Sequence, residues 1–307
     1  MVKSINYKEM KNIFLTFALL LFPFLGFMQV SINANEIIDK LNKGEAVHYE
    51  NVTISGDIDF RFINDKEKYT NIEVVFSDND TYKYHVNAPL KFSNCIFSGK
   101  FIAYFNDDEK DELHIAMFHQ DVVFNKCTFK SDFLAKYSEF DKLASFPGNK
   151  FEELALFKYA EFESEIDFTN SVFEEEANFK YAKFPMNTKF NNSKFMGDAN
   201  FKYSKVRDKI EFKDCEFTGL ADFKYTEFRD YVDFSGAKFK SDASFKYTEF
   251  PDGVSFENVL FDDFADFKYA KLHDPVNMKN VAFDGETSFK YTEIEGKEFV
   301  SYLLNNK

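Results

Sequence analysis

The triplet Phe-Lys-Tyr recurs at a fixed interval through the second half of the chain. It begins at Phe157, Phe179, Phe201, Phe223, Phe245, Phe267 and Phe289, which defines a 22-residue repeat. Lys136-Tyr137 adds an eighth copy in phase, with Ala135 in place of the phenylalanine. Self-similarity at a period of this length is typical of solenoids, in which each repeat stacks on its neighbours.

A finer period lies inside each unit. From Phe157 to Phe299 a large apolar residue follows at alternating steps of five and six, and 23 of these 27 positions are Phe. A small or β-branched residue usually stands two positions earlier. An α-helix would scatter positions five and six apart around its circumference. Four short sides, each with one small and one large inward residue, account for a 22-residue coil when two corners carry one extra residue.

This pattern resembles the pentapeptide-repeat family, whose motif is a small residue, Asp or Asn, Leu or Phe, and two variable residues. Ala177-Asn178-Phe179-Lys180-Tyr181 and Ala221-Asp222-Phe223-Lys224-Tyr225 match it. The resemblance covers roughly residues 113–299. It implies an all-β fold, a right-handed quadrilateral parallel β-helix. The extra residue at two corners departs from the motif and should make the cross-section slightly rectangular.

The register extends upstream of the regular coils. Phe60, Phe92 and Phe124 follow one another at a constant 32-residue spacing, which predicts early coils over residues 45–130, two of them with ten-residue excursions. One excursion carries the charged run 106–112, and the other is predicted to form a hairpin of residues 72–76 and 82–86. Regular coils should fill residues 131–299, followed by a tail at 300–307. Residues 35–44, with Ile37, Ile38 and Leu41 on one side, predict a capping helix.

The amino terminus has the composition of a secretory signal peptide. Three lysines precede an apolar run from Ile13 to Met28, and the segment ends at Ala34 before a polar stretch. This arrangement predicts a signal over residues 1–34, cleaved after Ala34, and an exported protein in the periplasm, on the cell surface or secreted. The alternative is an uncleaved segment that anchors the protein, which would be its only contact with a membrane.

Charge and the absence of catalytic motifs exclude several classes of function. The net charge of −14 argues against direct nucleic-acid binding, which needs a basic face. No phosphate-binding loop, catalytic constellation or metal-ligand spacing is present, so we expect neither an enzyme nor a cofactor. The sequence predicts an exported structural or protein-interaction scaffold, with an unidentified protein or a cell-envelope polymer as partner. One alternative is an acidic DNA mimic acting on gyrase-like enzymes, as some family members do.

Two sets of residues are candidates for function. One tyrosine per repeat should form a vertical file with a lysine file beside it: Tyr137, Tyr159, Tyr181, Tyr203, Tyr225, Tyr247, Tyr269 and Tyr291. This file is either a ligand strip, for instance for a glycan, or a corner residue multiplied by duplication. Cys95 and Cys127 share one inward position in neighbouring coils. They are either disulfide-bonded or two buried small residues.

Overall fold

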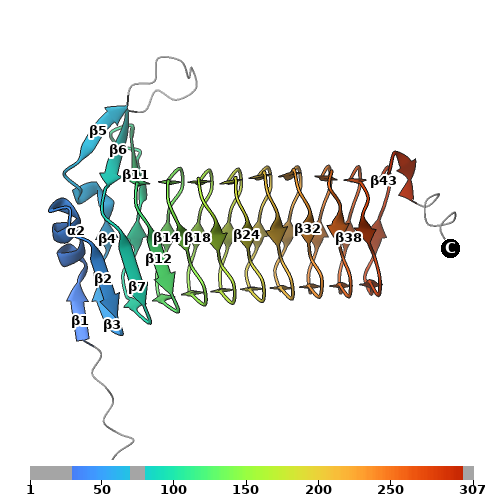
Figure 1. The fold of residues 1–307 in the computed structure, drawn as a ribbon, viewed down its shortest axis with the longest axis horizontal. Helices are drawn as coiled ribbons and strands as arrows, with labels where there is room; N and C mark the ends of the chain where they lie inside the picture. The colour runs from blue at the N-terminus through green and yellow to red at the C-terminus, as the bar shows by residue number, and fades with distance from the viewer. Residues whose placement is uncertain (1–29, 70–79, 300–307) are drawn as a thin grey trace, which may run out of the picture. The chain divides into compact units, whose positions relative to one another are not determined.

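A computed structural model describes residues 30–69 and 80–299 of the chain. The described residues from Ser31 onward form one compact unit, a solenoid of four parallel sheets (Figure 1). One regular coil consists of β20 (Ile166–Asp167), β21 (Val172–Phe173), β22 (Ala177–Asn178) and β23 (Lys183–Phe184), and the same four strands recur in the next 22-residue coil. The predicted quadrilateral β-helix is confirmed.

We number the four faces in chain order, by the sheets that form them. Face 1 runs from β2 (Val47–Glu50) to β40 (Val276–Asn277). Face 2 runs from β1 (Val30–Asn33) and β3 (Val52–Ser55) to β41 (Ala282–Phe283). Face 3 runs from β4 (Ile58–Asp59) to β42 (Thr287–Ser288). Face 4 ends at β43 (Glu293–Ile294), on which β44 (Lys297–Glu298) folds back antiparallel.

Stacked phenylalanine rings fill the interior. Phe212, fully buried, lies 5.2 Å from the ring of Phe190 and 5.0 Å from that of Phe234, and both neighbours are nearly parallel to it. It meets Phe201 and Phe223 edge-on, at 5.2 and 5.3 Å. Both geometries are favourable for aromatic pairs. The repeat therefore produces vertical stacks along each face and edge contacts between faces.

The early coils are longer than the regular ones. The strand register places Val47 beside Leu90, Leu90 beside Val122 and Val122 beside Ala144, so a 43-residue coil and a 32-residue coil precede the first 22-residue coil. The first excursion is thus about twice as long as predicted. Phe92 lies beside Phe124 as expected, but its other neighbour is Tyr49. Phe60 therefore does not belong to that file, and its matching spacing is coincidental.

Both excursions form antiparallel hairpins on face 4. The first pairs β5 (Lys66–Tyr69) with β6 (Asp80–Val86), and the second pairs β10 (Tyr104–Asp107) with β11 (Glu112–Phe118). β6 and β11 run parallel, side by side. The strand over residues 82–86 is confirmed. The pairing predicted for it with residues 72–76 was wrong, because Lys66 and Lys68 of β5 lie opposite Tyr84 and Tyr82. Residues 72–76 lie outside the described residues.

The large and small inward positions are exchanged in two early coils. On face 3, β14 (Phe133–Leu134) pairs with β18 (Ala155–Leu156), so Phe133 lies beside Ala155. Ala135 therefore lies at the position that corresponds to Phe157, and the ring of the eighth repeat is supplied by Phe133, two positions upstream. Phe101 lies beside Phe133 in the coil below, with the rings 4.3 Å apart. The interior keeps one ring per coil in this region, whichever of the two positions supplies it.

A helix covers the amino-terminal end, as predicted. α2 (Ala34–Asn42) buries Ile37, Ile38 and Leu41, and the Asn33 side chain caps it by accepting a hydrogen bond from the Asn35 N–H. β1 (Val30–Asn33) precedes it, and the Ile32 carbonyl accepts a hydrogen bond from Ser55. These residues, expected to leave with the signal, are therefore part of the fold.

Two of the predicted segments lie wholly or largely outside the described residues. They are the apolar stretch of the signal peptide, within residues 1–29, and the tail at 300–307. Within residues 30–69 and 80–299, no helix has both the length and the hydropathy needed to cross a bilayer.

Candidate functional site

The tyrosine–lysine corner joins face 3 to face 4. At each regular level the chain leaves face 3 through Lys and Tyr and turns sharply into face 4. All eight tyrosines of the file have left-handed backbone angles, with φ between 58° and 63°. The N–H groups of the first seven hold adjacent coils together; that of Tyr181, for example, donates to the carbonyl of Lys202 at 3.1 Å. The predicted vertical file is present, and its use as a ligand strip stays a prediction.

The tyrosine rings stack on one another along the solenoid axis. Ring centroids from Tyr137 to Tyr291 are 4.6 to 4.9 Å apart, and each ring between Tyr159 and Tyr269 has a neighbour against both of its faces. Tyr225, Tyr247 and Tyr269 are nevertheless 37 to 40% exposed. The file consequently presents ring edges and hydroxyl groups to solvent, and it offers few free ring faces on which a sugar could stack.

A lysine accompanies each tyrosine. In seven of the eight coils its ammonium nitrogen lies 4.7 to 5.4 Å from the centroid of the tyrosine that follows it, within reach of a cation–π interaction. Among the described residues only Lys224 of this file forms an ion pair, with Asp222 at 3.3 Å. Burial, and then the neighbouring Lys136 and Lys180, lower the pKa of Lys158. The corner therefore carries a row of largely uncompensated positive charges.

The diagonally opposite corner, between faces 1 and 2, provides an internal comparison. It also has a left-handed residue in each coil, with φ between 52° and 73°. All but Lys126 are Gly, Asn or Asp: Asn51, Asn94, Lys126, Gly148, Asn170, Asn192, Asp214, Gly236, Asn258 and Asn280. Gly, Asn and Asp adopt this conformation at low cost, whereas other residues pay about 1–3 kcal/mol. A tyrosine pair contributes about 0.5–1.5 kcal/mol. Stacking thus offsets the strain at best, and the fold alone does not require tyrosine here.

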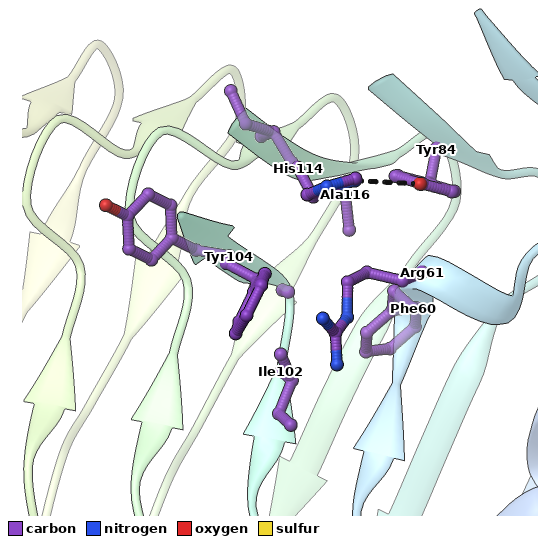
Figure 2. A pocket seen from close by; sticks show the side chains of 10 residues that line it. Phe60, Arg61, Tyr84, Ile102, Tyr104, His114 and Ala116 are labelled. Atoms are coloured by element: carbon purple, nitrogen blue, oxygen red, sulfur yellow. Dashed lines mark hydrogen bonds between the residues drawn. The ribbon is translucent and has the colours of Figure 1, made fainter. Parts of the chain in front are cut away.

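Tyr104, in the second hairpin, continues the file beyond the regular coils. Its ring lies 6.0 Å from that of Tyr137, and its hydroxyl accepts a hydrogen bond from Lys136 at 3.1 Å. Tyr104 also lines a small pocket beneath the two hairpins, where Tyr84 and His114 are joined by a 2.9 Å hydrogen bond (Figure 2). Sequence reasoning missed Tyr104 because it lies in an excursion, outside the 22-residue period.

The pocket beneath the hairpins is packed closed. The guanidinium of Arg61 lies 3.9 Å from the centre of the Phe105 ring and binds both carboxylate oxygens of Asp59. This hydrogen bonding raises the pKa of Arg61, and burial lowers the pKa of His114. No water-sized space remains among the lining side chains. The cluster thus holds the hairpins on the first coils.

Comparison with known proteins identifies the repeats of the regular coils. A model described as pentapeptide repeats (9 copies) matches residues 157–205, 201–246 and 223–271, all within the regular coils. Residues 157–271 of the chain therefore consist of pentapeptide repeats. No curated protein matches it. A similar solved structure is HetL, a pentapeptide repeat protein involved in heterocyst differentiation regulation from the cyanobacterium Nostoc sp. strain PCC 7120. It is 9% identical, with 86% of this chain and 97% of that chain covered and a TM-score of 0.21.

The cysteines of this pentapeptide-repeat protein occupy one inward file on face 2. Cys95 and Cys127 are buried free thiols in adjacent coils, and Asn149, Ser171 and Ser193 continue the file. Hydrogen bonding between the two thiols lowers the pKa of Cys95, and with burial it raises the pKa of Cys127. The structure therefore brings the predicted pair together, and the disulfide itself stays a prediction.

A chain of polar side chains crosses the base of the hairpins. His85 contacts His119 at 2.8 Å, His119 contacts Asp141 at 2.6 Å, and Glu67 lies 3.5 Å from His85. Among the described residues, no three such side chains are arranged to hold a metal ion. The spacing of His119 and Asp141 is one regular coil, but His85 comes from the long first excursion. Its contact with His119 was therefore not predictable from the period.

Proposed function

We propose that this pentapeptide-repeat protein is an exported, non-catalytic scaffold that binds a partner along its tyrosine–lysine corner. One observation carries the proposal. Tyrosine occupies a left-handed position in eight successive coils, while the opposite corner uses mainly Asn, Asp and Gly in the same conformation. Because the fold accepts the cheaper residues, we infer that the tyrosines are retained for their exposed edges and hydroxyl groups.

The interior supports a scaffold role. Catalysis usually takes place in a concave pocket that encloses the substrate. In the regular coils the space between the four sheets is filled by buried phenylalanine and small residues. Chemistry would have to take place on the outer surface, where many of the charged side chains form ion pairs with one another. Binding along an exposed face is what this architecture serves best.

Export rests on the amino-terminal sequence. A basic start followed by an apolar run describes a secretory signal. Fractionation of the native cells tests this part: the protein is expected outside the cytoplasm. Recovery in the cytoplasm would contradict export and favour the alternative, an acidic DNA mimic that meets gyrase-like enzymes there.

Binding at the corner is tested by a pull-down from the native cell envelope. We expect the full chain to retain a partner, and the variant with Tyr181, Tyr203, Tyr225 and Tyr247 changed to Ser to lose it. The matched control changes Asn170, Asn192, Asn258 and Asn280 to Ser, which alters the same number of left-handed positions on the opposite corner. Equal capture by both variants would contradict the proposal and leave the tyrosines as duplicated corner residues.

A further inference from the structure

We propose that the ligand of the tyrosine–lysine corner is a linear polyanion laid along the solenoid axis. This inference rests on the proposed function, because it assumes that the corner is a binding surface. Lysine ammonium groups and tyrosine hydroxyl groups would contact the anionic groups of one extended chain. The chain is recognised by its charge and its linear form, whether its anionic groups are phosphates or carboxylates.

The first argument is the charge at the corner. The protein has a net charge of −14, yet seven of the eight lysines at the corner have no carboxylate within 4.0 Å among the described residues. Lysines elsewhere are commonly paired; Lys150 contacts Glu152 and Glu174, and Lys240 contacts Glu216. The corner is therefore a basic line on an acidic molecule.

Several acids of face 4 beside this line are engaged by other cations. Face 4 begins two positions after each tyrosine, and its outward acids would otherwise neutralise the corner. Glu139 lies 4.0 Å from Lys83, Glu161 contacts Lys183, and Glu227 lies 3.7 Å from Lys205. These pairs stay within face 4 and the hairpins. The ammonium groups of the corner remain available to an external anion.

The second argument is the fixed spacing of the binding groups. Stacking holds successive tyrosines 4.6 to 4.9 Å apart, close to the separation of neighbouring strands. Within residues 30–69 and 80–299, no hydroxyl of the eight tyrosines makes a hydrogen bond. Each coil thus offers one phenol and one ammonium group at a constant interval. An array that is already ordered loses little conformational entropy when a ligand binds.

Other ligands fit these observations less well. A neutral glycan that stacks on aromatic rings needs free ring faces, and six of the eight rings have neighbours on both sides. A broad polyanion such as duplex DNA would bring its charge against the acidic surface on either side. A narrow single chain stays within the basic line, since screening weakens repulsion beyond about 8 Å at physiological salt.

The test measures binding of the full chain to linear polyphosphate and to polygalacturonate, with neutral dextran as the uncharged probe. We expect both polyanions to bind, dextran not to bind, and affinity to fall as salt is raised. Changing Lys158, Lys180, Lys202 and Lys246 to Gln should lower the affinity at least tenfold. The control changes Lys150, Lys189, Lys194 and Lys238 on faces 1 and 2 to Gln, with the same change in net charge, and should lower it less than threefold.

A second variant examines the hydroxyl groups. Changing Tyr159, Tyr181, Tyr203 and Tyr247 to Phe keeps the ring stack and should weaken polyanion binding several-fold. Equal losses in the two lysine variants, or no binding of either polyanion by the wild type, would overturn the proposal. If polyanions fail while the tyrosine-to-serine variant still loses its envelope partner, the polyanion is wrong and the proposed function stands.

Discussion

The exchanged positions Phe133 and Ala135 allow a double-mutant test of the register. In the next coil the order is Ala155 then Phe157, so the two coils supply their ring from different positions on face 3. Phe133 is fully buried, with the rings of Phe101 and Phe129 at 4.3 and 5.0 Å. Ala135 is equally buried. Exchanging the two residues gives this coil the order of the next one, with alanine before phenylalanine, and leaves the total side-chain volume unchanged.

The expected magnitudes follow from burial. Phe133→Ala alone should cost about 3–5 kcal/mol, since a fully buried ring is removed and a cavity remains. Ala135→Phe alone should cost about 1–3 kcal/mol, because it adds a ring beside Phe133 in a filled interior. In the double variant each change compensates the other. We expect a cost below about 2 kcal/mol, which corresponds to a coupling of at least about 2 kcal/mol.

Urea unfolding followed by far-ultraviolet circular dichroism provides the measurement, because the chain contains no Trp for fluorescence. Solenoids can unfold in segments, so the transitions of all four proteins must have the same slope before free energies are compared. A double variant whose cost equals the sum of the single costs would refute the reasoning. It would mean that the two positions do not share one space in the core.

Three further predictions concern the core, the cap and the surface charges. Phe212→Ala should lower the free energy of unfolding by about 3–5 kcal/mol, and Phe212→Leu by less than half of that. Phe62→Ala, at a residue 65% exposed, should change it by less than about 0.5 kcal/mol. Equal melting curves for Phe212→Ala and wild type would contradict the inward register. Asn33→Ala should lower the free energy of unfolding by about 1 kcal/mol, because the helix cap is lost. Asn35→Ala, which changes an exposed side chain, should leave it nearly unchanged. Equal effects of the two variants would show that the cap does not contribute. Burial raises the pKa of Glu211, but hydrogen bonds from Lys209 and Asn191 outweigh it and hold that pKa at about 2. A lowered pKa stabilises the fold above the unfolded value of about 4.3, and the stabilisation disappears as the pH falls toward 2. Glu211→Gln should therefore cost about 1 kcal/mol at pH 7, after allowance for solvent screening, and nothing near pH 2; a cost independent of pH would refute the ion-pair explanation.

The regular coils were predictable from the sequence because each coil repeats the same local pairing. A 22-residue period places each residue beside its counterpart in the next repeat, so the files of phenylalanine and tyrosine follow directly. The early coils break this rule. Their register depends on which strands pair across an excursion, as when Val47 lies beside Leu90. The 32-residue spacing of three phenylalanines suggested that they lie in one file, but the 43-residue first coil places Phe60 outside it.

The candidate site was predictable to a similar extent. The lysine and tyrosine files come from the repeat itself, and all eight tyrosines lie where the period places them. Tyr104 and His85 were missed, because both come from hairpins whose strand pairing is set by tertiary contacts. The closed pocket around Arg61 was missed for the same reason: its lining residues come from both excursions.

The orientation of the tyrosine rings determines what the corner can bind, and this orientation cannot be read from the amino-acid sequence. Eight aromatic residues in a line suggest a platform for sugars when only the sequence is considered. Rings 4.9 Å apart and nearly parallel cover one another, so the exposed chemistry becomes that of the phenol hydroxyl and the neighbouring ammonium group. The opposite corner shows that the backbone turn is possible without any of these groups. The strip is therefore better suited to anions than to sugar faces, and the lysines, which would be secondary in a glycan site, become its principal binding groups.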